Sequence, residues 1–277
     1  MSLSYDLHSH SSASDGCFSP TELVQYAQQH GVDVLALTDH DITSGISEAK
    51  HAAENLGLKV IAGVEISVIW RKQTLHILGL NIDSGNVALL VGLEKIRQAR
   101  LWRAQEMGRR LDKAGLPNMY EAAKAIANGE NVTRTHFARI LIAQGHAKDM
   151  KQVFKRFIVP GKPGYVAGDW AEMAQALEWI KNAGGTSVIA HPARYKLSAT
   201  KMRMMIDEFM QAGGEGIEVI SGSHSKDESQ RIAALARQYN LLASRGSDFH
   251  DPAIPYINMQ TLPPLPSDLT PVWDAWQ

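Results

Sequence analysis

The segment Tyr5-Asp6-Leu7-His8-Ser9-His10 begins as a short strand-like run and ends in two histidines. Successive side chains of an extended backbone point to opposite faces, so His8 and His10 are expected on the same face. Imidazole nitrogens are common metal ligands, and two of them on one face can share a metal ion. The segment therefore predicts a first strand that ends at a metal site.

Beyond this segment, strand-like runs alternate with helical patterns, which is typical of an α/β protein built from βα units. Ser19 and Pro20 favour the start of the first helix, and Gly31 favours its end. The patterns predict strands over 5–8, 34–38, 60–66, 74–81, 187–190, 218–221 and 241–244, and helices over 20–30, 44–56, 171–183, 200–212 and 228–239.

Residues 87–163 interrupt this alternation, because helical patterns dominate there and no convincing strand is present. We expect a helical insertion over 87–163 within an α/β domain formed by 1–86 and 164–277. The insertion begins with a long helix over 87–114, on which Arg97, Arg100 and Arg103 recur at a spacing of three. These arginines form a ridge that is either a solvated surface or part of a functional site.

Metal-binding residue types stand at or near the ends of the predicted strands. In a βα repeat, the carboxyl ends of the strands gather on one face, where such folds carry their chemistry. A lone histidine at a strand end is more often structural, but the recurrence of the pattern argues against that explanation for the whole set. The sequence predicts one multinuclear metal site formed by His8, His10, Asp15, His40, Glu65, His76, His191, Asp248 and His250.

The mixture of imidazole and carboxylate ligands restricts the identity of the metal ion. Imidazole is a softer donor than Mg²⁺ prefers, so Mn²⁺, Fe²⁺ or Zn²⁺ is expected. The single cysteine, Cys17, excludes an intrachain disulfide and a thiolate zinc cluster.

The overall charge is close to neutral, with 28 Lys plus Arg against 29 Asp plus Glu. A protein that binds long duplex nucleic acid normally carries a basic stripe, so no such partner is expected. The sequence shows neither a secretory signal nor an apolar run long enough to cross a membrane. We therefore expect a cytoplasmic protein without a membrane partner.

The motifs around these ligands resemble those of the polymerase and histidinol phosphatase (PHP) superfamily. They are Asp6-Leu-His-Ser-His10, Ser14-Asp-Gly16, Leu37-Thr-Asp-His-Asp41 and Gly63-Val-Glu-Ile-Ser67. The resemblance implies a distorted (β/α)7 barrel, similar to a TIM barrel, that binds three divalent metal ions. Manganese is the first choice for the identity of the metal. The implied ligand sets are His8, His10, Glu65 and Asp248; Asp15, His40 and His250; and Glu65, His76 and His191.

Within the superfamily, the motifs look most like the group of RNase AM and the 3′,5′-nucleoside bisphosphate phosphatases. The resemblance implies a phosphoesterase that removes the 3′-phosphate of 3′,5′-bisphosphonucleotides, or acts as a 5′-3′ exoribonuclease on short single-stranded RNA. In this group the insertion covers the active site, so Arg100 and Arg103 are candidates for substrate contact. Histidinol phosphatase activity and a noncatalytic accessory role are the alternatives.

Substrate phosphates need cations that do not bind the metal. Arg134 begins a predicted helix after Thr133, where free N–H groups and a guanidinium can meet phosphate. The candidate contacts from these loops and helix starts are Arg134, Thr135, His136, Lys162 and Arg194. Ordinary surface salt bridges are the alternative for the charged members.

The expected nucleophile is hydroxide generated at the metal cluster, which would attack phosphorus in line. The leaving hydroxyl needs a proton, for which Asp39, Asp41 and metal-bound water are all candidates. The general acid is therefore unassigned. For Asp39, orientation of a ligand histidine is the competing interpretation.

Overall fold

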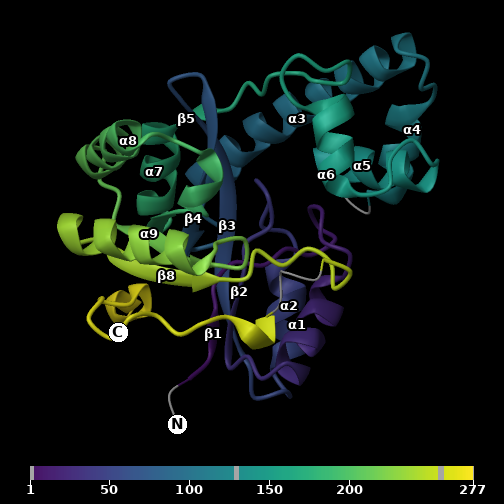
Figure 1. Ribbon diagram of the computed structural model, residues 1–277. Helices are drawn as coiled ribbons and strands as arrows, with labels where there is room; N and C mark the ends of the chain where they lie inside the picture. The colour runs from purple at the N-terminus through teal and green to yellow at the C-terminus, as the bar shows by residue number, and fades with distance from the viewer. Residues whose placement is uncertain (1–2, 128–130, 255–258, 277) are drawn as a thin grey trace.

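Seven strands form one sheet that curls into a nearly closed barrel in the computed structural model, which describes residues 3–127, 131–254 and 259–276 (Figure 1). The sheet order is β1-β2-β3-β4-β6-β7-β8, and the two-residue β5 pairs with β3. The barrel strands are β1 (Tyr5–Asp6), β2 (Val34–Leu37), β3 (Lys59–Trp70), β4 (Gln73–Leu80), β6 (Thr186–Ile189), β7 (Gly216–Ser221) and β8 (Leu242–Gly246), with β5 at Ala171–Glu172. The predicted α/β barrel class is confirmed.

Backbone contacts between the first and last strands nearly close the barrel. Leu7 donates its N–H to the carbonyl of Arg245 at 2.9 Å, and Asp248 donates to the carbonyl of His8 at 2.8 Å. Ser9 and Phe249 form a parallel bridge just beyond the strands. Residues from the two ends of the sequence therefore lie side by side at the same rim.

Helices cover the outside of the barrel, and local capping explains where several of them begin. They are α1 (Pro20–Gln29), α2 (Ile46–Ala53), α7 (Met173–Asn182), α8 (Ala199–Gln211) and α9 (Lys226–Tyr239). Ser19 and Glu22 form a capping box at α1, and Ser225 and Glu228 form another at α9. Gly31 follows α1 with a φ of 74°, which glycine adopts without strain. None of the described helices is long and apolar enough to span a membrane.

The prediction for the third strand was wrong in one respect: β3 does not end near Glu65 but continues to Trp70. It then turns through Arg71 and Lys72, whose φ angles are 48° and 65°, into β4. Strand β4 runs antiparallel to both β3 and β6, so the βα alternation is broken here. Glu65 consequently lies within a long hairpin instead of at a strand end, and His76 lies within the fourth strand as predicted.

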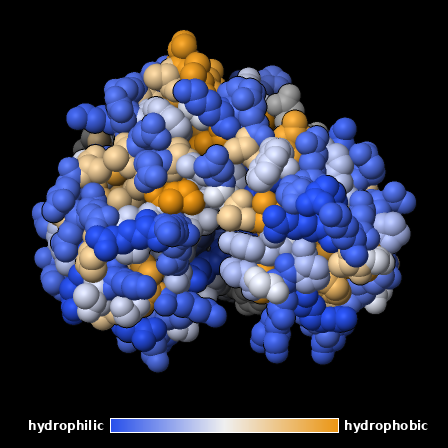
Figure 2. Space-filling view, turned by 90° about the horizontal axis from the view of Figure 1, so that it is seen from above, coloured by the Kyte–Doolittle hydropathy of each residue, from blue (hydrophilic) through white to orange (hydrophobic). Residues whose placement is uncertain are grey.

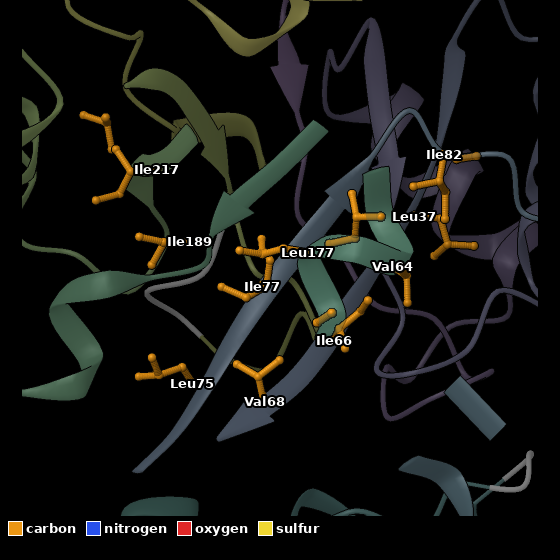
Figure 3. Close-up of a cluster of buried hydrophobic side chains, with 14 of the residues drawn as sticks. Leu37, Val64, Ile66, Val68, Leu75, Ile77, Ile82, Leu177, Ile189 and Ile217 are labelled. Atoms are coloured by element: carbon orange, nitrogen blue, oxygen red, sulfur yellow. The ribbon is translucent and has the colours of Figure 1, made fainter. Parts of the chain in front are cut away.

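Alternation along this hairpin separates two apolar layers. Val64, Ile66 and Val68 of β3 pack with Ile77 of β4 and Leu177 of α7 in the layer between sheet and helices (Figure 3). The residues between them point to the interior of the barrel, where a second cluster contains Leu7, Ala36, Ile61, Leu78 and Leu80. The same alternation directs Glu65 and His76 inward.

A group of helices lies between β4 and β5 in the sequence and stands together at one end of the molecule (Figure 1). It comprises α3 (Val87–Lys113), α4 (Met119–Ile126), α5 (Arg134–Ala143), α6 (Met150–Val153) and a five-residue π-helix, η1 (Phe154–Ile158). These helices have an apolar cluster of their own. The limits 87–163 for an inserted unit stay a prediction, and residues 128–130 within them lie outside the described part of the chain.

Candidate metal centre

The structure brings all nine predicted ligand residues together at one end of the barrel. Six of them are buried, and His40, His76 and His250 are partly exposed. They come from the segment after β1, the segment after β2, the β3–β4 hairpin, and the segments after β6 and β8. Burial of this many ionisable groups at one place is costly unless they are paired or bind a cation.

Glu65 is the centre of the arrangement. Its Oε1 lies 2.8 Å from Nδ1 of His76 and 2.9 Å from Nε2 of His191. Its Oε2 lies 2.9 Å from Nδ1 of His40 and 3.3 Å from Nε2 of His10. Both oxygens of one carboxylate thus face imidazole nitrogens that come from several segments of the chain.

Three groups of ligand atoms each fall within 4.8 Å of one another: His8, His10, Glu65 and Asp248; His10, Asp15, His40 and His250; and His40, Glu65 and His76. The first coincides with the first expected set. The second adds His10 to its expected set, and the third contains His40. His191 lies beside the third group, with Nε2 3.4 Å from Nδ1 of His76.

Several buried ligand atoms lie near one another but form no hydrogen bond of acceptable geometry among the described residues. They include Nε2 of His8, Nε2 of His10, Nδ1 of His40, Oδ1 of Asp15 and Oε2 of Glu65. An unsatisfied buried polar atom costs about 1–3 kcal/mol, so a cluster of such atoms is expected only where something else satisfies them. The donor set fits divalent cations, and the buried clusters are consistent with a site for several metal ions.

Outer hydrogen bonds orient two of the histidines. Glu218 Oε1 lies 3.1 Å from Nδ1 of His8, and the carbonyl of Asp248 lies 2.9 Å from Nδ1 of His250. When Nδ1 donates a hydrogen bond in each case, the lone pair of Nε2 faces the cluster and is free to bind a metal ion. Glu218 also accepts the backbone N–H of His191 at 2.5 Å. The sequence interpretation missed Glu218, although an acidic residue inside the apolar run Ile217-Glu-Val-Ile220 was an available signal.

The electrostatics of the cluster keep its carboxylates charged. Burial opposes charge on Asp15, Glu65 and Asp248, but the neighbouring histidines outweigh it, with Arg194 adding to the effect at Asp248. The pKa of each carboxyl therefore lies well below its ordinary value. Burial lowers the pKa of His40 to about 4, and burial together with Arg194 lowers the pKa of His191 to about 3. Neutral imidazole and ionised carboxylate are the forms that bind metals.

His8 and His10 behave differently because both lie beside Glu65 and Asp248. Burial opposes their charge, but Glu218, Glu65 and Asp248 raise the pKa of His8 well above its ordinary value. Asp248 and Glu65 raise the pKa of His10 to about 10. Its Nε2 is 3.2 Å from Oδ1 of Asp248. The potential at this nitrogen is therefore negative, which favours a proton or a divalent cation there, and the two compete for the same position.

A cavity of about 590 Å³ adjoins the cluster and extends to the helices of residues 87–163. Seen from the side of these helices, the molecule has a hollow bordered mainly by hydrophilic residues (Figure 2). Besides the cluster residues, the lining of the cavity includes Lys72, Arg100, Arg103, Thr133, Arg134, Thr135, Phe154, Tyr165, Trp170 and Arg194.

Two of the lining arginines have no acidic partner within the described part of the chain. Arg103 donates from Nε to the carbonyl of Val166 at 2.9 Å, and Arg134 lies over the ring of Phe154, 5.5 Å from its centroid. Burial and the positive charges of Arg134 and Arg100 lower the pKa of Arg103 to about 9, so it is still charged at neutral pH. Burial and the charges of Arg100 and Arg194 also lower the pKa of Arg134. An anion between these guanidinium groups would relieve their repulsion.

The other predicted substrate contacts lie in different surroundings. Arg194 pairs with Oδ2 of Asp248, and Arg100 is held by Asp41. Thr135 lines the cavity, but His136 and Lys162 are absent from its lining. Nδ1 of His136 accepts the backbone N–H of Thr133 at 3.0 Å and so caps α5, and Lys162 is exposed.

The two candidate acids are also engaged in hydrogen bonds. Asp39 accepts from the backbone N–H and Oγ of Ser11 and from Oγ of Ser14, at 2.8, 2.6 and 2.5 Å. It therefore holds the turn that carries Asp15, and none of these partners is a histidine. Asp41 accepts from Arg100 and from the backbone of Ser67.

Comparison with known proteins agrees with this geometry. Residues 6–186 match the PHP domain family. The chain is 46% identical to a 3′,5′-nucleoside bisphosphate phosphatase of Chromobacterium violaceum, over 97% of this chain and 94% of the relative. It is 44% identical to a 5′-3′ exoribonuclease of Haemophilus influenzae over the full length of both. A solved structure from Chromobacterium violaceum, described as an amidohydrolase with bound sulfate, superposes with a TM-score of 0.94 at 44% identity, covering 99% of this chain and 95% of the other.

Proposed function

The chain belongs to the PHP domain family, and from that premise we propose that it is a metal-dependent phosphoesterase acting on nucleotides. It hydrolyses the 3′-phosphate of 3′,5′-bisphosphonucleotides and removes 5′ nucleotides from short single-stranded RNA. The names of two full-length relatives support these two substrates. The observation that carries the proposal is the position of Glu65, whose two oxygens face five histidines beside a cavity rich in arginine.

The proposed resident ions are three divalent cations, with Mn²⁺ first and Fe²⁺ or Zn²⁺ as alternatives. The nine residues of the cluster would hold these ions, with Glu65 at their centre. When bound, such ions neutralise phosphoryl oxygens and lower the pKa of water, which supplies a nucleophile near neutral pH. The protein's own contribution is to fix the imidazoles: Glu218 orients His8, and the carbonyl of Asp248 orients His250.

Arg103 and Arg134 are the proposed contacts for the second phosphate of the substrate. Both line the cavity, and no acidic partner in the described residues neutralises them. Thr135 and the first turn of α5 add hydrogen-bond donors beside Arg134. Arg194 is already paired with Asp248, so its proposed role is to hold that carboxylate as well as to face the substrate. Lys162 and His136 have no place in this proposed contact set.

One site can perform both reactions because the bond that breaks is the same. In a 3′,5′-bisphosphate and at the 5′ end of RNA, hydrolysis separates phosphorus from the 3′ oxygen of a nucleotide that carries a 5′-phosphate. Arg103 and Arg134 would hold the 5′-phosphate while the cluster acts on the 3′ phosphoester. The near-neutral charge of the chain suits short substrates.

A substrate comparison tests the proposal. Protein loaded with Mn²⁺ is incubated with adenosine 3′,5′-bisphosphate, a short 5′-phosphorylated RNA, the same RNA with a 5′-hydroxyl, and histidinol phosphate. We expect the highest kcat/KM for the bisphosphate and the phosphorylated RNA, and a much lower value for the 5′-hydroxyl RNA. Preference for histidinol phosphate would favour a small-metabolite phosphatase, and lack of turnover on every substrate would favour a noncatalytic role.

A further inference from the structure

We propose that Asp41, Arg100 and Ser67 form a positioning unit that fixes helix α3 to the two segments carrying His40 and Glu65. The inference rests on the proposed metal-dependent function. In this unit Arg100 acts through Asp41 on the metal cluster and is not a phosphate contact. Arg100 was expected from the sequence to reach the substrate, so the unit gives it a different role.

The contacts of the unit form a closed set. Asp41 Oδ2 accepts from Nε of Arg100 at 2.6 Å and lies 2.5 Å from one terminal nitrogen of the same guanidinium. That nitrogen also donates to Oγ of Ser67 at 2.7 Å. Asp41 Oδ1 accepts the backbone N–H of Ser67 at 2.7 Å. Each residue of the unit therefore contacts the other two, Ser67 through its hydroxyl to Arg100 and through its backbone N–H to Asp41. The planar guanidinium makes contacts that lysine cannot reproduce.

The unit is buried and connects parts of the chain that are far apart in sequence. Asp41 is fully buried, Ser67 is 1% exposed and Arg100 is 6% exposed. A buried pair of opposite charges with satisfied hydrogen bonds holds its geometry firmly, because separation would leave an unpaired charge in a poorly solvated place. Helix α3 is thereby tied to the barrel rim.

Both attachment points are next to cluster residues. Asp41 directly follows His40 and has a φ of 54°, a left-handed conformation that needs support from its surroundings. Its backbone N–H donates to the carbonyl of Glu65 at 3.0 Å. Ser67 lies two residues after Glu65 and pairs with His76 across the hairpin. A shift of Asp41 or Ser67 would therefore move His40, Glu65 or His76.

The charges in the cavity separate the roles of its arginines. Asp41 neutralises Arg100, whose guanidinium also lies over the Trp170 ring at 4.9 Å from the centroid. Arg103 and Arg134 have no such partner in the described residues. Arg194 is likewise paired with Asp248. The cavity thus contains two arginines committed to carboxylates of the protein and two that are available to an anionic ligand.

A double-mutant cycle tests the unit through metal binding. Mn²⁺ affinity is measured by titration calorimetry on chelator-treated wild type, Asp41→Asn, Arg100→Gln and the double variant. Each single variant is expected to weaken Mn²⁺ binding about 10-fold, as loss of an outer-sphere partner does. The double variant is expected to bind no more weakly than either single one, because both remove the same interaction. Arg109→Gln, an exposed residue of the same helix, is the matched control.

The proposal is overturned if the losses of Mn²⁺ affinity in the two single variants multiply in the double variant. It is also overturned if both single variants bind Mn²⁺ as tightly as the wild type. A higher KM for the bisphosphate in Arg100→Gln with unchanged Mn²⁺ affinity would overturn it too, since that is the behaviour of a phosphate contact. If the charge variants fail to fold, Ser67→Ala decides in the same assay: weaker Mn²⁺ binding supports the unit and unchanged binding contradicts it. Lack of Mn²⁺ binding by the wild type would overturn the proposed function itself.

Discussion

At the scale of single residues, charge balance distinguishes two kinds of group around the cavity. Glu65 and Asp248 sit among histidines that keep them ionised despite burial, which favours cations. Arg103 and Arg134 sit without acidic partners in the described residues, which favours anions. The two regions adjoin one cavity. A ligand with a phosphate at each region would satisfy both.

Replacing Arg134 with alanine should reveal this division. Loss of a charged hydrogen-bonding partner costs about 1.5–3 kcal/mol, which corresponds to roughly 10- to 100-fold in KM for a 3′,5′-bisphosphonucleotide. A simple aryl phosphate has no second phosphate, so its KM should change little. Steady-state kinetics on both substrates provide the measurement. Lys155→Ala is the control, because this exposed cation of η1 does not line the cavity. Equal losses on both substrates would remove Arg134 from the second phosphate site.

At the scale of elements, the barrel seam sets the position of the first ligands. Strand β8 lies so close to the segment after β1 that a Cβ on Gly246 would be 2.3 Å from the Cβ of His8 and 2.6 Å from its backbone nitrogen. Backbone atoms cannot give way as a flexible side chain can. Glycine is required here by close approach of two chain segments.

Gly246→Ala should therefore both destabilise the protein and displace His8. We expect a loss of about 1–3 kcal/mol in the free energy of unfolding, measured with urea, and weaker Mn²⁺ binding. Gly85→Ala is the matched control, because its Cβ would meet only Oδ1 of Asp83 at 3.4 Å. Equal stability of the two variants would show that the seam can relax.

The elements also show how far the sequence can predict this structure. Most helices and strands were predicted to within a few residues of their observed bounds. The prediction used apolar runs and local capping signals, such as Ser19 at the start of α1. The reversed β4 was not predictable from periodicity, because parallel and antiparallel strands share the same alternation. The turn at Arg71 and Lys72 contains none of the residues that normally favour positive φ.

The candidate site was predictable to a similar degree. Residue type, together with strand-end position for most of them, selected the nine residues that the structure brings together, whereas the partners of Arg100 and the capping role of His136 depend on tertiary contacts. Glu218 reaches His8 from 210 positions away. An acidic residue in an apolar run marks Glu218 as unusual, but no local pattern identifies a partner at that distance, and only the barrel topology brings the two residues together.

At the scale of the whole molecule, the cluster joins segments from both ends of the chain and the middle of the barrel. Ions bound there would connect the segments after β1, β6 and β8 with the β3–β4 hairpin. A ligand that binds only the folded state stabilises that state in proportion to its concentration relative to Kd. Metal binding should therefore stabilise the fold as well as enable catalysis.

Removing the ions with a chelator should abolish hydrolysis and lower the melting temperature, and Mn²⁺ should restore both. At a concentration of about 100 times Kd, the stabilisation is roughly 2.7 kcal/mol, or about 5 °C for a protein of this size. Differential scanning calorimetry with and without Mn²⁺ measures the shift. The same melting temperature under both conditions would be inconsistent with ions that bridge these segments.

The central claim is that the histidine and carboxylate cluster itself carries out phosphoester hydrolysis. The most direct measurement is kcat of His10→Ala on adenosine 3′,5′-bisphosphate, with the fold checked by circular dichroism and the metal content measured in the same preparation. His10 lies in two of the three ligand groups, so kcat is predicted to fall by about 10²-fold or more while the fold is retained. Near-normal kcat in a folded, metal-containing His10→Ala protein would contradict the account.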